Sequence, residues 1–269
     1  MTKSTIGNLH YLSILMAIGL PTVFIITLAV AVNQDHVVLF FPYISDTGTT
    51  PPESCIFGQL LNMTAILMSM IVFVRYAQVK EILVSYQYSS YWRKLNFISC
   101  IIGMISTLGM TMVANFQETS MLTVHLIGAV LCFGGASLYI ILQSACSWRI
   151  QPNGCSSSTV KLRIILSIFC TICFFTVFIT AALSAKEFTG KDIKKWTKFD
   201  GGWTYHLIST ISEWSCAVAI CIYIISFTNE FRELQLTFPK VTFKVDYAKK
   251  NYSVFDANSG TMNSPTRST

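Results

Sequence analysis

The chain has 269 residues, of which 52% are hydrophobic and only 12% are charged, with a formal net charge of +6. Soluble domains carry roughly twice that charged fraction, so the composition excludes an ordinary soluble globular protein. The positive charge is spread along the chain without the clustered basic stripe that nucleic acid binding needs. We therefore expect membrane lipids as partners and no nucleic acid.

Apolar residues gather in six blocks, each close to the roughly 20 residues that a helix needs to cross a bilayer. The blocks cover residues 11–32, 56–74, 95–114, 121–145, 162–183 and 203–227. Backbone polar groups inside a bilayer must be hydrogen-bonded internally, so each block should be a helix. We predict an all-α, polytopic six-helix membrane domain over residues 1–231, without room for a soluble catalytic domain. A polar cytosolic tail over residues 232–269 follows, and we expect it to be largely disordered.

The distribution of Lys and Arg predicts the orientation in the membrane, because these residues are enriched in cytoplasmic loops. In a six-span chain the N-terminus, the second and fourth loops and the tail share one side, and they hold most of the Lys and Arg. We therefore expect both termini to be cytosolic. Arg163, at an edge of the fifth block, is expected to snorkel toward the interface. Trp196, Phe199 and Trp203 near the fifth loop are expected to lie at the opposite interface. That side holds Lys only in the fifth loop, at Lys186, Lys191, Lys194, Lys195 and Lys198.

The first non-cytosolic loop contains the triplet Asp46-Thr47-Gly48, which is spelled like the catalytic triplet of aspartic proteases. That chemistry needs two carboxylates that share one proton, whereas the chain has one such triplet and no Asp within a block. We interpret the triplet as a turn, in which Asp46 hydrogen-bonds the backbone two residues on and Gly48 takes a positive φ. Glu53 then lies near the start of the second helix, where its charge favours the helix dipole. Asp35, Asp46 and Glu53 all belong to this first loop, which contains neither Lys nor Arg. A cation or a basic partner could dock there. The alternative is that the three acids are simply solvated.

The sequence PYISDTGTTPPESCIFG, residues 42–58, resembles the signature of the Frag/DRAM/Sfk family. NMTAILMSMIVFVRYAQV (62–79), GMTMVANFQETSMLTVHLIGAVLCFGGASLY (109–139) and YHLISTISEWS (205–215) are similar to later parts of it, in the same order. Within the family the chain looks most similar to the damage-regulated autophagy modulator branch. The loop residues that carry the signature are Pro42, Tyr43, Ser45, Asp46, Thr47, Gly48, Pro52 and Glu53.

This resemblance implies a six-span, non-enzymatic protein of the lysosomal or endosomal membrane that promotes autophagy and is linked to cell death. Relatives in other branches act at the plasma membrane, for example on lipid asymmetry, so the plasma membrane is the alternative location. The resemblance supplies no catalytic residues and no cofactor.

Polar residues inside the membrane are expensive and usually face the interior of a bundle. Glu213 lies near the middle of the sixth block, and His206 and Thr210 share its helical face. His125 lies near the non-cytosolic end of the fourth block. Our first interpretation is that Glu213 cross-links the helices of the bundle through hydrogen bonds. The alternative is a polar pocket between the fourth and sixth spans, where Glu213 binds a proton, a cation or a lipid head group.

Two classes of function remain open at this stage. A modulator would bind lipid or recruit partners, whereas a transporter, channel or lipid scramblase would use Glu213 at its centre. No second acid lines a path with Glu213 in the sequence, which argues against a proton relay. The sequence contains no metal-ligand cluster and no nucleotide-binding loop, so we expect no cofactor.

Small residues four apart predict close helix packing in the third and fourth spans. They are Ser99, Gly103 and Thr107, and Gly128, Cys132 and Ala136. Cys146 and Cys155 are expected near the membrane on the cytosolic side, either as palmitoylated or as free reduced thiols.

The tail contains Tyr252-Ser253-Val254-Phe255, a Tyr-x-x-bulky pattern of the kind that adaptor complexes bind in cargo bound for endosomes and lysosomes. The same pattern begins at Tyr11 and Tyr76, but only Tyr252 is well clear of the membrane. Tyr252 and Phe255 are therefore our candidate sorting residues.

Overall fold

The computed structural model describes residues 5–237, and within them it confirms the all-α prediction. Six helical stretches are long and apolar enough to cross a membrane. The first three are α1 (His10–Asn33), α2 (Glu53–Ser85) and α3 (Ser90–Asn115). The fourth combines α4 (Glu118–Ala129), the π-helical turn η2 (Val130–Gly134) and α5 (Gly135–Ile150). The fifth is α6 (Ser157–Glu187), and the sixth joins α7 (Trp203–Ile225) to α8 (Thr228–Arg232).

The chain divides into two compact units. Residues 7–235 form the helical unit. In the other unit, two short antiparallel strands pair, β1 (Thr5–Ile6) with β2 (Leu236–Thr237).

Local signals explain where several helices begin. The Ser156 side chain accepts a hydrogen bond from the backbone N of Thr159 at 3.2 Å, so it caps α6. Gly202 precedes α7 with φ of +78°, a conformation that favours glycine. It turns the chain out of the fifth loop and into the sixth span.

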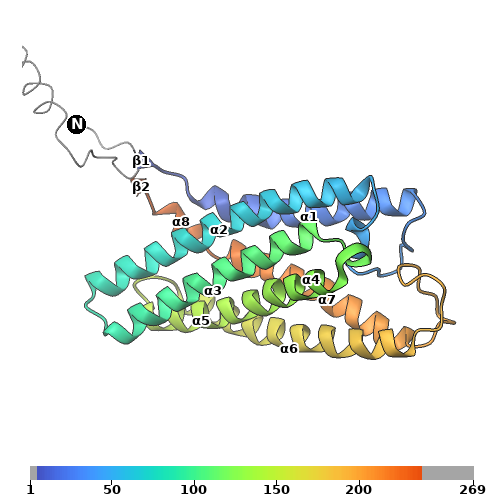
Figure 1. Ribbon diagram of the computed structural model, residues 1–269. Helices are drawn as coiled ribbons and strands as arrows, with labels where there is room; N and C mark the ends of the chain where they lie inside the picture. Colours follow the sequence, from blue (N-terminus) through green and yellow to red (C-terminus); the bar gives the residue numbers. More distant parts are fainter. Residues whose placement is uncertain (1–4, 238–269) are drawn as a thin grey trace, which may run out of the picture. The chain divides into compact units, whose positions relative to one another are not determined.

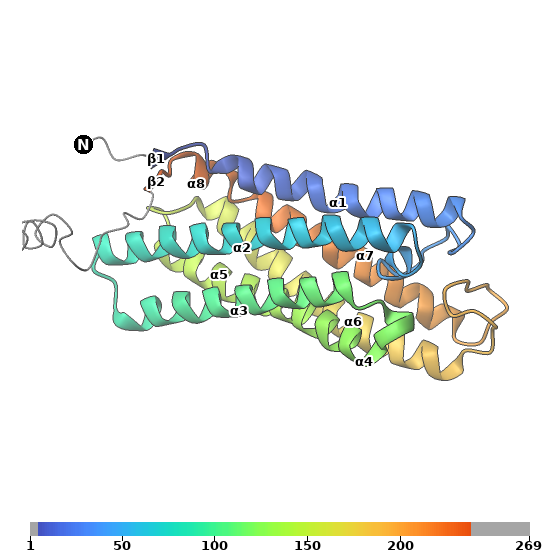
Figure 2. The same cartoon turned by 45° about the horizontal axis from the view of Figure 1, so that its top comes forward.

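The helices of the helical unit lie side by side in a bundle (Figures 1 and 2), and their contacts form a closed ring in chain order. α1 packs on α2, α2 on α3, α3 on α4 and α5, α5 on α6, and α6 on α7, which returns to α1. We call the end with loops 34–52, 116–117 and 188–202 the odd-loop end. The end with loops 86–89 and 151–156, together with α8, is the even-loop end.

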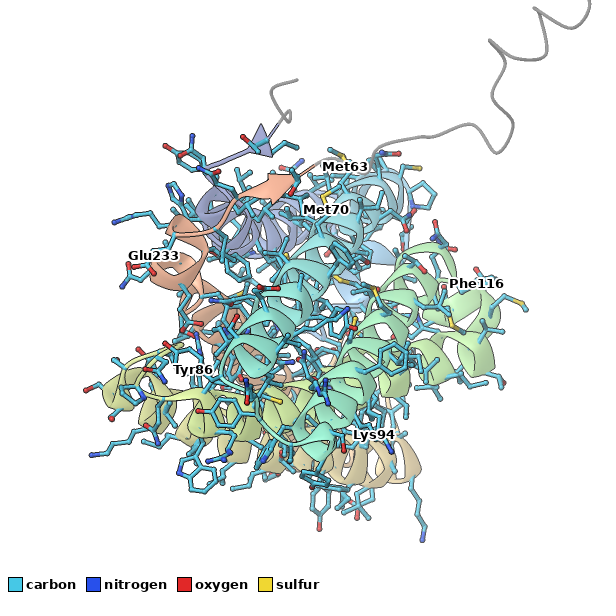
Figure 3. All side chains as sticks on the ribbon, turned by 90° about the vertical axis from the view of Figure 1, so that its left-hand side faces the viewer. Met63, Met70, Tyr86, Lys94, Phe116 and Glu233 are labelled. Carbon is cyan, nitrogen blue, oxygen red and sulfur yellow. The ribbon has the colours of Figure 1, made fainter. Side chains whose placement is uncertain are left out.

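The outer surface of the ring is apolar, as a helix bundle in lipid requires. Seen end-on, Met63 and Met70 lie on the outside of α2, where 57% and 52% of each side chain is exposed (Figure 3). These residues would contact acyl chains.

Glycines allow the helices to approach closely, as predicted. A Cβ on Gly128 of α4 would lie 2.8 Å from Cβ of Met112 of α3. A Cβ on Gly103 of α3 would lie 2.8 Å from Cγ1 of Val72 of α2. Gly109, which the spacing analysis missed, packs against the backbone of η2, where a Cβ on it would lie 2.4 Å from the N of Cys132.

The fourth span changes geometry at its middle. At η2 the helix widens into a π-turn, and the hydroxyl of Ser106 on α3 donates to the carbonyl oxygen of Cys132 at 2.8 Å. Turns of this kind interrupt a helix ladder and often accompany functional sites. Here the turn faces the interior of the ring, next to the cavity described below.

Candidate functional site

The signature loop, residues 42–53, folds back into the odd-loop end of the ring. Asp46–Gly48 forms the 3₁₀ turn η1. The backbone N of Tyr43 donates to Oδ2 of Asp46 at 3.1 Å, and the Thr47 hydroxyl donates to the Ile44 carbonyl at 2.7 Å. The Thr47 hydroxyl also lies 3.0 Å from that of Thr27 on α1. The loop is thus a cap on the bundle.

This geometry corrects the predicted turn. Asp46 is 2% exposed and bonds a residue three positions before it, so it is not a solvated acid that bonds two residues on. Gly48 does not take a positive φ. Its glycine is required by packing, because a Cβ there would lie 2.3 Å from Cγ of Phe57.

Glu53 is the first residue of α2, as predicted, and Pro52 precedes it as the N-cap. Its side chain is fully buried, and Oε1 lies 2.7 Å from Nδ1 of His36. Lysines of the fifth loop reach the first loop: Lys195 pairs with Asp35 at 2.9 Å, and Lys194 donates to the Thr50 hydroxyl at 3.1 Å. Basic groups of the same chain therefore meet the acids at the rim of this loop.

Glu213 of α7 contacts the signature loop directly. His206, Thr210 and Glu213 are all buried inside the bundle. Oε2 of Glu213 accepts a hydrogen bond from the backbone N of Ile44 at 2.8 Å. The next residue, Trp214, donates from Nε1 to the Pro42 carbonyl at 2.9 Å. The sixth span thus holds the loop through two neighbouring residues.

The two histidines have different surroundings from those we expected. His206 stacks on Trp196, with ring centroids 4.3 Å apart, and meets the edge of Tyr43. Neither His206 nor Thr210 lines the cavity that holds Glu213. His125 does line it, but its Nδ1 lies 2.7 Å from the Phe116 carbonyl, which terminates the preceding helix. Trp196 is 4% exposed, so it is not the interfacial residue that its position suggested.

A cavity of about 430 Å³ fills the interior of the ring. Apolar side chains from all six spans line it, and its acidic and basic side chains are Glu118, His125 and Glu213. Ser106 and Thr107 add hydroxyls, each of which donates to a backbone carbonyl. The cavity is therefore an apolar chamber with a polar wall where the signature loop enters.

Glu118 is the functional candidate that sequence reasoning missed. It lies in the first turn of α4, and its Oε2 accepts a hydrogen bond from the Ser45 hydroxyl at 3.0 Å. Burial raises the pKa of Asp46 well above its usual value, and the charge of Glu118 raises it further. The expectation that no second acid accompanies Glu213 is thus wrong. Only the folding of the loop over α4 brings these acids together, and no spacing in the sequence indicates it.

The cavity reaches the outer surface between α4 and α6. α4 packs on α3, whereas α6 packs on α5 and α7. Leu122 and Leu126 of α4 line the cavity and are about half exposed, and Ala182 and Ala185 of α6 line it and are exposed as well. An acyl chain of the bilayer would find an apolar entrance here.

A second polar cluster closes the ring toward the even-loop end. Arg75 of α2 and Arg163 of α6 are fully buried, and both pair with Glu230 of α8, Arg163 at 2.6 Å. Gln143 accepts from Arg75 at 3.2 Å. The Phe227 ring lies under both guanidinium groups, 4.8 and 4.6 Å from their carbons.

This cluster corrects the expectation that Arg163 snorkels. Its side chain turns into the bundle because Glu230 neutralises it there and because Ser147, Ser226 and the Ser226 carbonyl accept its remaining hydrogen bonds.

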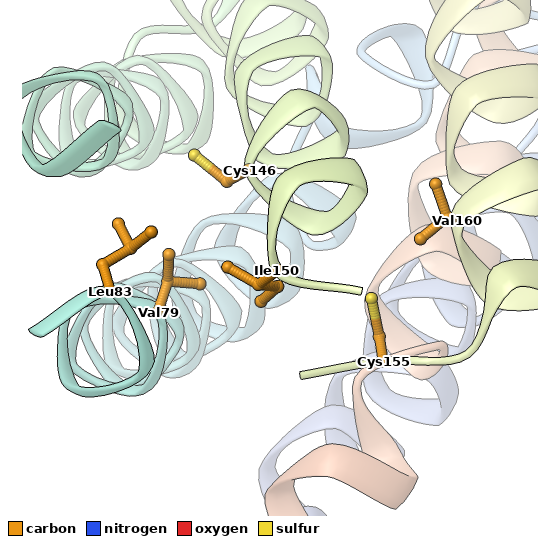
Figure 4. Packing of buried hydrophobic residues seen from close by; sticks show 6 residues of the cluster. All are labelled: Val79, Leu83, Cys146, Ile150, Cys155 and Val160. Carbon is orange, nitrogen blue, oxygen red and sulfur yellow. The ribbon is translucent and has the colours of Figure 1, made fainter. Parts of the chain in front are cut away.

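The two candidate palmitoylation sites are buried near the even-loop end. Cys146 packs with Val79, Leu83 and Ile150, as Figure 4 shows. The Cys155 thiol donates to the Ser147 carbonyl at 3.3 Å, and burial raises its pKa. Modification of either thiol would need this end of the bundle to open. The sorting candidates Tyr252 and Phe255 lie outside the described residues.

Comparison with known proteins places this architecture. A sequence model of the Frag1/DRAM/Sfk1/Cwh43P N-terminal domain matches residues 8–234. The chain is 33% identical to DNA damage-regulated autophagy modulator protein 2 of Bos taurus over 232 residues, 85% of this chain and 86% of the relative. It is 35% identical to DNA damage-regulated autophagy modulator protein 1 of Homo sapiens over 215 residues, 79% and 87% of the two chains.

A shorter match adds a differently named relative. The chain is 38% identical to Modulator of macroautophagy TMEM150B-B of Xenopus laevis over 131 residues, 49% of this chain and 54% of the relative. No solved structure matches the chain. The resemblance that the signature loop indicated is thereby confirmed. The family match covers the whole ring of helices and the loop that caps it, so this chain belongs to the Frag1/DRAM/Sfk1/Cwh43P family and has autophagy modulators among its relatives.

Proposed function

We propose that this chain modulates autophagy from the lysosomal or late endosomal membrane, without catalysing a reaction. In this proposal it binds a membrane lipid in the ring cavity, and its cytosolic surfaces recruit partner proteins. The observation that carries the lipid-binding part is the apolar cavity with one polar wall and an entrance between α4 and α6. The names of the relatives support the autophagy part.

The proposed orientation puts both termini in the cytosol and the odd-loop end in the lumen. The distribution of Lys and Arg supports it. Of the basic residues counted for the cytosolic side, Arg75 and Arg163 are buried in the bundle and contribute less to this argument than surface residues. Lys94 and Arg149 remain at the even-loop end to support it, because both are exposed.

A transporter, channel or lipid scramblase is the rival proposal, and the shared position of Glu118 and Glu213 in one cavity favours it. The polar cluster of Arg75, Arg163 and Glu230 argues against it. Arg75 follows the cavity-lining Met68 by two turns of α2, and all three cluster residues are paired and packed. A bound lipid fits a chamber that is closed toward one side better than a continuous path does.

The first experiment locates the protein and measures its effect. A fluorescently tagged full chain is imaged against lysosomal and plasma-membrane markers, and autophagic flux is measured in cells with and without it. We expect lysosomal signal and a change in flux. Signal at the cell surface with unchanged flux would contradict the proposal and would favour a role in plasma-membrane lipid asymmetry.

Two variants separate the parts of the proposal. Tyr252→Ala should move the protein to the cell surface if adaptor complexes bind the tail at Tyr252 and Phe255, and an unmoved variant would discard that motif. Glu213→Gln keeps an acceptor for the Ile44 N–H but removes the charge. A modulator that acts through its partner-binding surfaces should keep most of its effect on flux as long as the variant reaches its membrane, whereas a transporter centred on Glu213 should lose its activity.

A further inference from the structure

The charge of the cavity wall restricts what the cavity can hold. Among the described residues that line it, there are two carboxylates, Glu118 and Glu213, and neither Lys nor Arg. A third carboxylate, Asp46, is buried next to Glu118. The one basic group, His125, uses Nδ1 on the Phe116 carbonyl and holds Nε2 3.9 Å from Glu118. The polar wall therefore has an excess of acid.

The carboxylate of Glu213 can accept further hydrogen bonds. Its Oε2 accepts from the Ile44 N–H, and Oε1 has no hydrogen-bond partner among the described residues. A carboxylate oxygen on a low-dielectric wall binds a charged donor strongly, because charge-assisted hydrogen bonds are about twice as strong as neutral ones. Tyr43, which also lines the cavity beside Ile44, adds an aromatic ring near this position.

The volume and the entrance select the remainder of the ligand. At about 30 Å³ for each water-sized group, the cavity of about 430 Å³ has room for a hydrocarbon chain of roughly a dozen carbons with its head. The entrance between α4 and α6 is apolar, with Leu122 and Ala182 on its two sides. A single-chain amphiphile can enter there from the bilayer.

From this arrangement we infer that the cavity binds a single-chain lipid with a cationic amine head, held by an ion pair between its ammonium group and Glu213. The inference rests on the proposed lipid binding and specifies the ligand class. The hydrocarbon chain lies among the apolar residues between the spans. Lipids with a phosphate or carboxylate head are excluded, since the wall offers no Lys or Arg and would place like charges together.

The test is photocrosslinking on the full chain in phosphatidylcholine nanodiscs at neutral pH. The probe is dodecylamine with a diazirine in its chain, and the labelled residues are mapped by peptide mass spectrometry. Unlabelled dodecylamine, dodecanol and dodecanoate compete. We expect labels on cavity residues, and competition by the amine about tenfold stronger than by the alcohol, as a charge-assisted bond predicts. Dodecanoate should compete least.

Three variants assign the effect to Glu213. Glu213→Gln should weaken competition by the amine about tenfold and leave the alcohol unchanged. Glu81→Gln, an exposed acid on α2, makes the same charge change outside the cavity and should behave as wild type. Ala217→Phe fills the cavity one turn from Glu213 and should remove labelling by the probe. Thermal melting checks that each variant is folded. If Glu213→Gln does not fold, Ala217→Phe still tests whether the probe binds in the cavity.

The outcomes separate the two proposals. Equal competition by amine and alcohol, or an unchanged Glu213→Gln, overturns the amine head but leaves lipid binding in the cavity. Labels confined to the outer surface, or labelling that Ala217→Phe does not reduce, overturn both the ligand class and the lipid-binding part of the proposed function. Loss of amine preference in Glu213→Gln alone supports the inference.

Discussion

At the residue scale, the carboxylates of the odd-loop end determine how the signature loop responds to pH. Asp46 is buried beside Glu118, and the pKa of Asp46 is raised first by burial and then by Glu118. The folded state therefore holds this proton more tightly than the unfolded chain does. Stability is lower above the folded pKa, and it rises as the pH falls toward the unfolded value of about 3.9. Acidification therefore stabilises the folded state, in which the loop caps the bundle.

Asp46→Asn tests this linkage. The amide keeps an oxygen that can accept from the Tyr43 N–H but cannot ionise. We expect a higher melting temperature than wild type at neutral pH and a difference that shrinks on acidification, because wild-type Asp46 then gains its proton. Melting curves between about pH 4 and pH 7 measure it.

Asp35→Asn is the matched control, since the Asp35 side chain is 94% exposed and its left-handed backbone suits Asn. If Asp46→Asn and Asp35→Asn show the same pH dependence, the raised pKa of Asp46 does not act on stability.

At the element scale, α8 holds the spans of the ring together at its even-loop end. Glu230 pairs with two buried arginines from α2 and α6 and offsets part of their charge, so the short helix ties together spans that lie far apart in sequence. Thr228 adds a contact with Ser13 of α1 at 3.1 Å. Burial of two positive charges in a bundle is costly unless a partner compensates them, and Glu230 is that partner.

Glu230→Gln should therefore destabilise the bundle by about 3–5 kcal/mol, the typical cost of removing one partner of a buried ion pair. Thermal or denaturant unfolding of the purified protein in detergent measures the change. Glu233→Gln is the control, because Glu233 lies three residues on and is exposed (Figure 3). Equal stability of the two variants would show that the ion pairs of α8 do not hold the ring together.

At the scale of the whole molecule, the closed ring gives the protein two chemically different ends. The odd-loop end holds the acidic wall and the cap, and the even-loop end holds the arginine cluster. Which end faces the lumen decides whether acidification reaches Asp46. The proposed function therefore depends on the orientation.

Cys55 can report that orientation. It is the exposed one of the nine free cysteines and lies in the first turn of α2, at the odd-loop end. We expect that a membrane-impermeant maleimide fails to label Cys55 in cells whose plasma membrane alone is permeabilised, and labels it once all membranes are opened. The control is Cys55→Ser combined with Lys94→Cys, which puts an exposed thiol near the even-loop end and should be labelled in both states. The reverse pattern would invert the topology.

The sequence by itself determined the six spans, the packing role of Gly103 and Gly128, and the membership in the family. These depend on local hydrophobicity, small-residue spacing and a contiguous motif, which are properties of the chain taken a few turns at a time. The shared interior face of His206, Thr210 and Glu213 followed from helical periodicity for the same reason.

Only the tertiary structure decided what those residues meet. Glu118 and Ser45 come together because the first loop folds over α4. His206 lies outside the cavity lining and stacks on Trp196 of the fifth loop. Arg163 is buried because α8 returns to neutralise it. In each case the partner lies more than 60 residues away or on a loop, so loop closure and helix packing set the contact, and no local pattern encodes it.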